Sequence, residues 1–265
     1  GMGRACATAL AQLAPDAELI LCDVSAGALE EAQTELAESS ITATCVAADL
    51  LDAEAVRDLG KRVARAGGLR ALAHTAGLSP TDLDARRIFD VNLVASARLV
   101  GELTPHLRSG AAGVLVSSQS AHMAAASATA EIDAILDAPL AAGAYERLVE
   151  RAGALASQPG GAYALSKRGV QRLAVAAAPA WGAAGARIVS ISPGIVETGM
   201  GQREYGAHQG AMDVILDKTP VGRRMGKPAE IAAVVAFLCS DGASFVSGVD
   251  WLVDGGSTQQ VMRPG

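Results

Sequence analysis

Strand-like and helix-like segments alternate along most of this 265-residue sequence. Apolar runs at 18–23, 42–47 and 69–74 predict strands, and helical patterns follow the first two at about 25–39 and 53–66. Such alternation is typical of βαβ units, in which the strands run parallel and the helices cover both faces of the sheet. The pattern therefore predicts one α/β domain over residues 1–265, with right-handed crossovers between its strands.

Glycines and acidic residues stand where the predicted strands end or a helix begins. Gly3, Asp23, Asp49 and Gly77 all fall there, and ligands of such sheets bind beyond the carboxyl ends of the strands, so we expect one shared site. A helix start favours a phosphate, and Asp23, 20 residues after Gly3, has the spacing of a carboxylate that meets the ribose of a dinucleotide. Two alternatives stay open: the first glycines form a flexible end or tag remnant, and Asp23 caps the helix beginning near Ser25.

The composition argues against several functional classes. Half of the residues are hydrophobic but only 3% are aromatic, so Ala, Val, Leu and Ile must fill the core. A net charge of -6 and a pI near 5.3 argue against nucleic acid as a partner. The four cysteines lack a Cys-x-x-Cys pair or a nearby histidine, so we expect no metal site. Neither a membrane span nor a signal peptide is visible, which favours a cytoplasmic protein without a membrane partner.

The second half continues the pattern with two interruptions. A helix is expected at about 82–107, strands at 113–116, 187–191 and 249–253, and a further helix at 228–239.

The interruptions are an insertion and a lid. Amphipathic helical runs at 130–137 and 143–156, closed by Pro159-Gly-Gly161, predict a helical insertion over about 122–160 that packs on the domain surface. Residues 199–218 mix glycines with apolar and polar residues, as a mobile substrate lid does.

Polar side chains in this half are candidates for chemistry. Asn92 lies inside the helix expected at 82–107, and Ser117-Ser118-Gln119-Ser120 follows the strand at 113–116. Each also has an ordinary structural explanation: a buried amide with satisfied hydrogen bonds, or a serine that caps the end of a strand.

Tyr163 and Lys167 stand four residues apart in an Ala-rich run that predicts a helix over 162–178. This spacing places the phenol and the ammonium on one helix face. A nearby cation favours the phenolate, so we expect Lys167 to lower the pKa of Tyr163 from its usual value of ~10. The alternative is a half-buried ring beside a solvated lysine.

Together these stretches resemble the short-chain dehydrogenase/reductase family over nearly the whole chain. Gly1-Met2-Gly3 resembles the end of the family's glycine-rich loop, Asp49 its adenine-contacting acid, Ala76-Gly77 the end of its Asn-Asn-Ala-Gly motif, and Pro193-Gly194 with Thr198 its Pro-Gly-x-x-x-Thr. The resemblance implies a doubly wound, Rossmann-like sheet and a set of cofactor-binding residues. These are Gly1, Met2, Gly3, Asp23, Asp49, Leu50, Ala76, Gly77, Tyr163, Lys167, Pro193, Gly194, Val196 and Thr198.

Four residues match the family's catalytic positions: Asn92, Ser118, Tyr163 and Lys167. Ser118 is preferred over Ser120 because Ser118-Gln-Ser-Ala121 fits the family's Ser-x-x-Gly. The resemblance implies that the tyrosine is the acid/base, the serine positions the substrate oxygen, the lysine holds the ribose, and the asparagine keeps a water in a proton relay.

Within the family, the chain resembles the bacterial 3α-hydroxysteroid dehydrogenase/carbonyl reductases. The shared features are the insertion, its start at Ser120-Ala-His122, the run Pro179-Ala-Trp-Gly182, the short link from Gly77 to Asn92 and the ending Val261-Met-Arg-Pro264. The resemblance implies an oxidoreductase for a secondary alcohol or ketone, such as a hydroxysteroid or another apolar alicyclic compound. The alternative is a catalytically silent NAD-binding regulatory or structural protein of the same fold.

The cofactor expected is NAD, because the Asp23 carboxylate would repel the 2′-phosphate of NADP, an effect that Arg4 could only partly offset. The insertion would cover one of the family's two usual association surfaces. We therefore expect a homo-oligomer, a dimer through the last helix and strand, with a tetramer as the alternative.

Two departures from the family pattern stand out. His74-Thr75 replaces the usual Asn-Asn, and the family's first strand and the start of its glycine loop have no counterpart in the sequence. Omitting a central strand exposes two unpaired ladders. We therefore expect that residues upstream of Gly1 exist in the functional protein or that cofactor binding is impaired.

Overall fold

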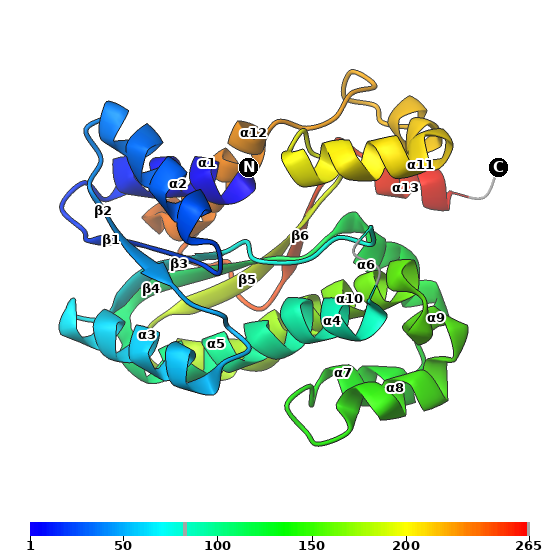
Figure 1. Ribbon diagram of the computed structural model, residues 1–265, viewed down its shortest axis with the longest axis horizontal. Coiled ribbons are helices and arrows are strands. Elements are labelled where there is room, and N and C mark those ends of the chain that lie inside the picture. Colours follow the sequence, from blue (N-terminus) through cyan, green and yellow to red (C-terminus); the bar gives the residue numbers. More distant parts are fainter. Residues whose placement is uncertain (82–83, 264–265) are drawn as a thin grey trace.

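Parallel strands form two separate sheets in the computed structural model, which describes residues 1–81 and 84–263 (Figure 1). The larger sheet has the order β3-β4-β5-β6, with the bounds Leu69–His74, Leu107–Val116, Arg187–Pro193 and Asp250–Val253. The smaller sheet pairs β1 (Leu19–Asp23) with β2 (Ala43–Ala47). All the pairings are parallel, as predicted.

The larger sheet is built around β4 and β5, which have a strand on each side. Leu115 of β4 lies opposite His74 of β3 and Ser190 of β5. Side chains of a strand alternate between the two faces of a sheet. Accordingly, Leu115 packs into the core on one face, whereas Val114 and Val116 pack into the core on the other. Both strands are buried along their carboxyl-terminal halves, so their ends are rigid supports for a site.

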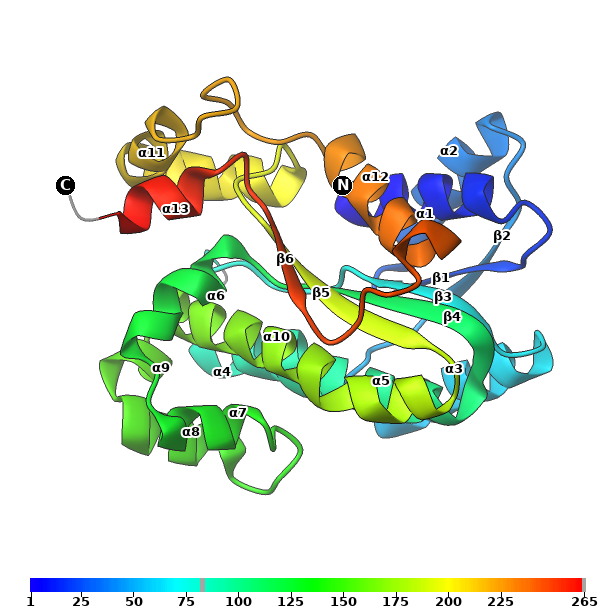
Figure 2. The ribbon, with the colours of Figure 1, turned by 180° about the vertical axis from the view of Figure 1, so that it is seen from behind.

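No described strand pairs with both β1 and β3, and these two strands are not paired with each other. Helix α1 (Met2–Leu13) packs against both of them, at the place where the two sheets meet (Figure 2). The side chains from Leu19 to Cys22 are only partly buried, unlike those at the centre of β4 and β5. Among the described residues, no strand lies between β1 and β3 to join the two sheets.

Helices cover both faces of the sheets, as the alternation predicts (Figures 1 and 2). One layer holds α3 (Ala53–Arg65), α4 (Ala85–Phe89), α5 (Ala95–Leu103) and α10 (Pro159–Ala183). The other layer holds α1, α2 (Ala26–Glu38) and α12 (Pro228–Cys239). Trp181 at the end of α10 is fully buried and donates from its ring N–H to Thr104 Oγ1 at 3.2 Å.

The segment between β4 and α10 packs against α4 and α10 (Figure 1). It comprises α6 (Gln119–Ala124), a 3₁₀ turn (Ala125–Ser127), α7 (Ala130–Leu136), α8 (Ala144–Ala152) and α9 (Ala154–Ser157). Arg168 of α10 donates two hydrogen bonds of 2.7 Å to Asp133, and the Tyr145 ring lies 5.5 Å from that of Phe89. The insertion therefore covers part of the outer face of α4 and α10, while residues near the end of α10, such as Val175, stay exposed.

The helix expected at about 82–107 is interrupted. A π-helix, η1 (Asp90–Val94), separates α4 from α5, a 3₁₀ turn (Thr104–His106) follows, and β4 begins at Leu107, earlier than the predicted strand. Pro105 cannot donate a backbone hydrogen bond, which accounts for the end of the helix. Residues 82–83, where the expected helix starts, lie outside the described residues, as does Pro264.

The loop expected at Pro159-Gly-Gly161 is instead the first turn of α10. Proline suits the first turn of a helix, where its missing N–H is not needed. A side chain on Gly161 would come within 1.9 Å of the Leu155 carbonyl oxygen, so glycine is required by close contact. Sequence periodicity did not indicate α6 or the last helix, α13 (Ser257–Met262), because both are short.

Helix α11 (Gly199–Asp217) forms the segment predicted as a lid and lies with α13 beyond the carboxyl ends of β5 and β6 (Figure 1). It is bent at His208, whose φ and ψ are −135° and 34°. Most of its residues are exposed. Among the described helices, none combines the length and the apolar character needed to cross a membrane.

Candidate active site

The carboxyl ends of β3, β4 and β5 bring the predicted site residues of the larger sheet to one edge. Ala76-Gly77 follows β3, Ser118 follows β4, and Pro193-Gly194 ends β5. Helix α10 crosses beneath this edge and carries Tyr163 and Lys167. Segments far apart in the sequence thus form one cluster.

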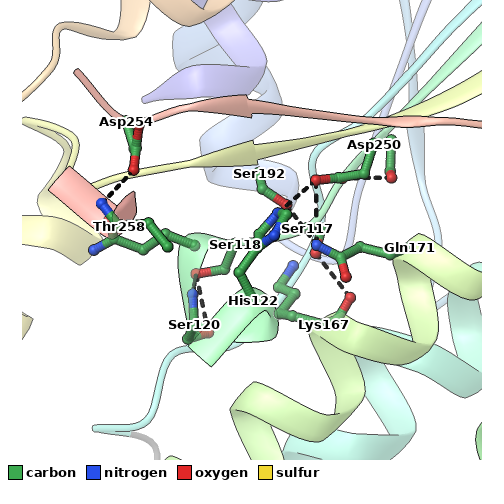
Figure 3. Close-up of polar contacts among 12 residues, drawn as sticks. Ser117, Ser118, Ser120, His122, Lys167, Gln171, Ser192, Asp250, Asp254 and Thr258 are labelled. Carbon is green, nitrogen blue, oxygen red and sulfur yellow. Dashed lines mark hydrogen bonds and ion pairs between the residues drawn. The ribbon is translucent and has the colours of Figure 1, made fainter. Parts of the chain in front are cut away.

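Lys167 is anchored to the end of β4 (Figure 3). Its Nζ donates to the Val116 carbonyl oxygen at 2.9 Å, and Ser117 Oγ donates to the Lys167 carbonyl oxygen at 2.8 Å. The lysine is 5% exposed. Its Nζ lies 5.9 Å from the centre of the Tyr163 ring, so the two groups share one face of α10, as their spacing predicts.

The pKa values of this pair move in opposite directions. Burial lowers the pKa of Lys167 to about 8, partly opposed by the charge of Glu204. Burial, and then the charge of Glu204, raise the pKa of Tyr163 to about 12, while a hydrogen bond with Ser118 lowers it. The expectation that Lys167 brings the pKa of the phenol below its usual value is therefore wrong for the groups of this chain, because desolvation of the phenolate and repulsion by Glu204 outweigh the lowering effect of the hydrogen bond with Ser118.

Ser118 is the N-cap of α6 and stands beside the phenol. Its Oγ accepts hydrogen bonds from Ser120 N at 3.2 Å and from Ser120 Oγ at 3.1 Å (Figure 3). Ser118 forms the hydrogen bond with Tyr163. This arrangement supports Ser118, rather than Ser120, as the residue that meets the substrate oxygen, with Ser120 orienting it.

Asn92 lies in the π-helix η1, a type of helix that is frequent at functional sites. Its Oδ1 accepts from Leu78 N at 2.7 Å, and its Nδ2 donates to Leu78 O at 3.1 Å and to Ser166 Oγ at 3.3 Å. A side chain on Gly77 would lie 3.0 Å from Asn92 Oδ1 and 3.1 Å from Lys167 Nζ. Asn92, Gly77 and Lys167 therefore converge; that Asn92 holds a water stays a prediction.

Glycines let the backbone pass closely at the same edge. A side chain on Gly3 would come within 2.9 Å of Thr75 Oγ1, and one on Gly194 within 2.9 Å of Asp254. Gly1 is the N-cap of α1, and Met2 packs partly into the core beneath α12. The start of α1 therefore lies beside the end of β3, and the free N–H groups of a helix start favour a phosphate.

The two predicted acids belong to the smaller sheet. Asp23 is exposed at the end of β1, and its Oδ1 accepts from Ser25 N at 2.9 Å, so it shapes the turn and still presents a carboxylate. Asp49 Oδ1 accepts from Leu51 N at 2.9 Å, and its Oδ2 lies 3.6 Å from Arg87 Nη2. Leu50, the residue after Asp49, packs against the core. Arg4 is ion-paired with Glu31 and Glu35 of α2.

Val196 and Thr198 connect the end of β5 to the lid. Val196 is buried and forms an isolated bridge with Gly226, and Thr198 Oγ1 accepts from Gly201 N at 3.0 Å, which caps α11. One turn further, Glu204 is close enough to Tyr163 and Lys167 to shift the pKa of both groups. No local pattern singles out Glu204, because its effect on Tyr163 depends on a contact between segments 41 positions apart.

Another group that sequence reasoning missed surrounds Asp250 of β6 (Figure 3). Asp250 Oδ2 lies 2.8 Å from His122 Nε2 and accepts from Gln171 Nε2 at 3.2 Å, and Asp250 Oδ1 accepts from Ser190 Oγ at 2.6 Å. This network ties α6, which carries Ser118, to β5, β6 and α10. His122 and Asp250 are 128 positions apart, so no local pattern reveals their contact.

These residues fit a nicotinamide dinucleotide. The glycines lining the edge leave space that a side chain would fill, the start of α1 suits a phosphate, and Asp23 presents an exposed carboxylate where the adenosine ribose is expected. The residues that would hold the two ends of the dinucleotide belong to different sheets, however. Asp23 and Asp49 lie at the strand ends of the smaller sheet, and the catalytic candidates lie on or against the larger one.

Comparison with known proteins identifies relatives along nearly the whole chain. Residues 1–130 match the family described as short chain dehydrogenase, and residues 149–258 match the family described as Enoyl-(Acyl carrier protein) reductase. The 3-alpha-hydroxysteroid dehydrogenase/carbonyl reductase of Comamonas testosteroni is 34% identical over 235 residues, covering 83% of this chain and 88% of that protein.

Two further relatives extend this picture. The cis-4-hydroxycyclohexanecarboxylate dehydrogenase of Sinomonas cyclohexanicum is 28% identical over 267 residues, covering 97% of this chain and 92% of that protein. The crystal structure of a short-chain dehydrogenase/reductase of the glucose/ribitol dehydrogenase type from Brucella melitensis has a TM-score of 0.72 and 27% identity, covering 97% of this chain and 92% of that one.

Proposed function

We propose, from the premise that this chain belongs to the short-chain dehydrogenase/reductase family, that it transfers a hydride between NAD(H) and a secondary alcohol or ketone. The observation that carries the proposal is the convergence of Tyr163, Lys167, Ser118 and Asn92 at one sheet edge. A silent binding protein has no need of an acid/base, its hydrogen-bonding serine and a buried amine in contact. Catalysis is therefore the better account.

The nicotinamide dinucleotide, when bound, supplies or accepts the hydride. Tyr163 holds the proton that the substrate oxygen gains when a ketone becomes an alcohol. Because the phenol has a pKa raised to about 12, it stays protonated at neutral pH, which is the form that a proton donor needs. Ser118, hydrogen-bonded to that phenol, would position the same substrate oxygen.

Lys167 and Asn92 support Tyr163, the proposed proton donor. Lys167 has a pKa lowered to about 8, so it can give up or regain a proton near neutral pH. Its Nζ is aimed at the end of β4 by the Val116 carbonyl oxygen, and Asn92 fixes the neighbouring loop through Leu78. We assign to Lys167 the roles of holding the ribose and of returning a proton toward Tyr163.

The preference for NAD over NADP is supported by charge at the end of β1. Asp23 presents an exposed carboxylate there, and a 2′-phosphate placed beside it would be repelled. Arg4, the basic residue that could offset this repulsion, is already paired with two glutamates of α2. The local charge therefore favours a free ribose hydroxyl.

The substrate class proposed is an apolar alicyclic ketone or alcohol, including hydroxysteroids. Two named relatives act, by their names, on a hydroxysteroid and on a hydroxycyclohexane carboxylate. The lid contributes Met200, Met212 and Ile215, which suit a hydrocarbon ring.

The test is a rate assay with NADH or NADPH and a panel of ketones that includes cyclohexanone, a 3-oxosteroid and acetone. We expect NADH oxidation with the cyclic ketones, slower oxidation with acetone, and a preference for NADH over NADPH. NADH binding, followed by fluorescence, without turnover of any ketone or of the matching alcohols with NAD would contradict the proposal and favour the silent protein.

We also propose a homodimer formed through α12 and the edge strand β6. The insertion occupies part of the outer face of α4 and α10, whereas Phe237, Phe245 and Val249 are exposed around β6, and Phe245 is fully exposed. Exposed aromatic residues beside an unpaired strand edge are typical of an association surface. Light scattering of wild type and Phe245→Glu tests this: we expect a dimer that the charge weakens, and a monomeric wild type would contradict it.

A further inference from the structure

His74 ends β3 at a position where the family pattern has asparagine, and it is buried, with 5% of its surface exposed. Its Nε2 lies 2.8 Å from Ser96 Oγ in α5. Ser96 is 1% exposed, so water cannot compete for this contact. A buried pair of polar side chains must satisfy its hydrogen bonds internally. His74 and Ser96 do so with each other and with the backbone of Asn92, a candidate site residue.

Ser96 passes the connection to the backbone of Asn92. Its Oγ donates to the Asn92 carbonyl oxygen at 2.6 Å, one helical turn back. That carbonyl belongs to the π-helix η1, in which backbone hydrogen bonds span five residues instead of four. The Ser96 hydroxyl therefore adds a donor to a carbonyl group whose helix geometry departs from the α-helix on either side.

The direction of each hydrogen bond follows from the number of protons. A serine hydroxyl has one hydrogen, and Ser96 places it on the Asn92 carbonyl oxygen. Ser96 Oγ must then accept from His74, so the imidazole carries its proton on Nε2. Burial, reinforced by the charge of Lys167, lowers the pKa of His74 to about 4, so the ring is neutral at physiological pH.

This series of hydrogen bonds leads to the surroundings of Lys167, one of the proposed catalytic residues. Asn92 holds Leu78 by two hydrogen bonds and also reaches Ser166, which neighbours Lys167 in α10. Gly77 lies so close to Asn92 Oδ1 and Lys167 Nζ that a single added carbon would contact both. A rotation of Asn92 would consequently displace the loop that borders the amine.

We propose that His74 and Ser96 are positioning residues, which act through Asn92 to hold the Gly77-Leu78 loop and the amine of Lys167 in working geometry. This inference rests on the proposed function for its catalytic consequence. The series of hydrogen bonds from His74 to Asn92 does not depend on the proposed function, and it is tested separately.

The first test needs no turnover. Long-range ¹H–¹⁵N spectra of the four histidine rings in the 265-residue protein are recorded from pH 5 to 9, with His74 assigned by its loss in His74→Gln. We expect a neutral ring protonated on Nε2 over the whole range, with its N–H signal protected from solvent and shifted in Ser96→Ala. A His74 ring protonated on Nδ1, or one that titrates near pH 6.5, would refute the series of hydrogen bonds from His74 through Ser96 to Asn92.

The second test measures ketone reduction with NADH by His74→Leu, which removes the donor, and His74→Gln, which keeps an N–H at a similar reach. We expect kcat to fall about tenfold in His74→Leu and in Ser96→Ala, with the ketone KM within about twofold, and His74→Gln to restore most of kcat. The double variant should fall no further than either single variant, because both interrupt one chain.

Asn92→Ala distinguishes positioning from general support of the fold. In that background, His74→Leu should have little further effect on kcat, whereas a merely structural role would give losses that multiply and follow the fall in Tm. Losses of kcat that multiply between His74→Leu and Asn92→Ala, or a wild-type kcat in Ser96→Ala, would overturn the inference. Ser96→Ala removes a single oxygen, so it replaces His74→Leu in this test if that variant does not fold. A wild-type protein without ketone turnover would refute the proposed function and this positioning role with it, while the ring spectra would still decide the hydrogen-bonded chain.

Discussion

The two sheets of this protein differ in how fully they are built. In the larger sheet, β4 and β5 have neighbours on both sides and are buried to their carboxyl ends, where Ser118 and Gly194 begin the site. In the smaller sheet, β1 pairs with β2 alone among the described strands, and its side chains are partly exposed. The half with the catalytic candidates is thus supported by strands with two neighbours, whereas the half with Asp23 is joined to the rest by α1 and by side chains such as Ile20 and Val46 that pack against the main core.

Hydrogen exchange tests this comparison with the largest expected difference. Backbone amides of β4 and β5 should exchange about a thousandfold or more slowly than those of β1 that lack a strand partner, because only global unfolding exposes the former. Mass spectrometry of peptides from both sheets measures the rates. Equal protection of β1 and β4 would show that the open edge is covered in solution and would remove the contrast.

Lys167→Met tests the catalytic half. The substitution keeps the length and packing of the side chain but removes the amine that Val116 orients, so kcat for ketone reduction should fall about a hundredfold, within the range typical of proton-transfer groups. Lys61→Met in α3 is the matched control, since Lys61 is exposed and forms an ion pair with the exposed Asp58. Comparable activity of the two variants would argue against a role for Lys167.

Asp23→Asn tests the cofactor half. The amide keeps an oxygen for Ser25 N–H but removes the charge, so the ratio of kcat/KM for NADPH to that for NADH should rise about tenfold, with kcat for NADH little changed. Asp16→Asn, an exposed acid before β1, is the control. A constant ratio would mean that the end of β1 does not meet the adenosine ribose.

Glu204→Gln should give the smallest effect. The charge of Glu204 raises the pKa of Tyr163 because it disfavours a second negative charge nearby. Its removal should lower that pKa, so the pH midpoint for alcohol oxidation, which needs the phenolate, should move to lower pH, with rates at fixed pH changing only a few-fold. A midpoint that moves upward, or a profile identical to wild type, would show that the lid does not act on the phenol.

Much of the fold could be predicted because its signals are local. The periodic segments of β3 and α12 occur where the sequence indicates them, and the alternation predicts parallel strands covered on both faces. The predicted site residues of the larger sheet lie together for the same reason, since the ends of parallel strands share an edge.

The remainder depends on contacts that no local pattern contains. The π-helix at Asn92 interrupts a segment whose apolar pattern favours one continuous helix, and it is accompanied by Ser96 and His74 from different elements. The pKa of Tyr163 was predicted in the wrong direction because burial and Glu204, which lies 41 positions away in the lid, are properties of the folded chain.

The central claim is that the Tyr163 phenol carries the proton in a hydride transfer coupled to NAD(H). The most direct measurement compares wild type with Tyr163→Phe for NADH binding and for NADH oxidation by cyclohexanone. We predict unchanged NADH affinity and a kcat lower by about a thousandfold or more, because phenylalanine preserves the packing and removes the proton. Activity of the variant within about threefold of wild type would contradict the account.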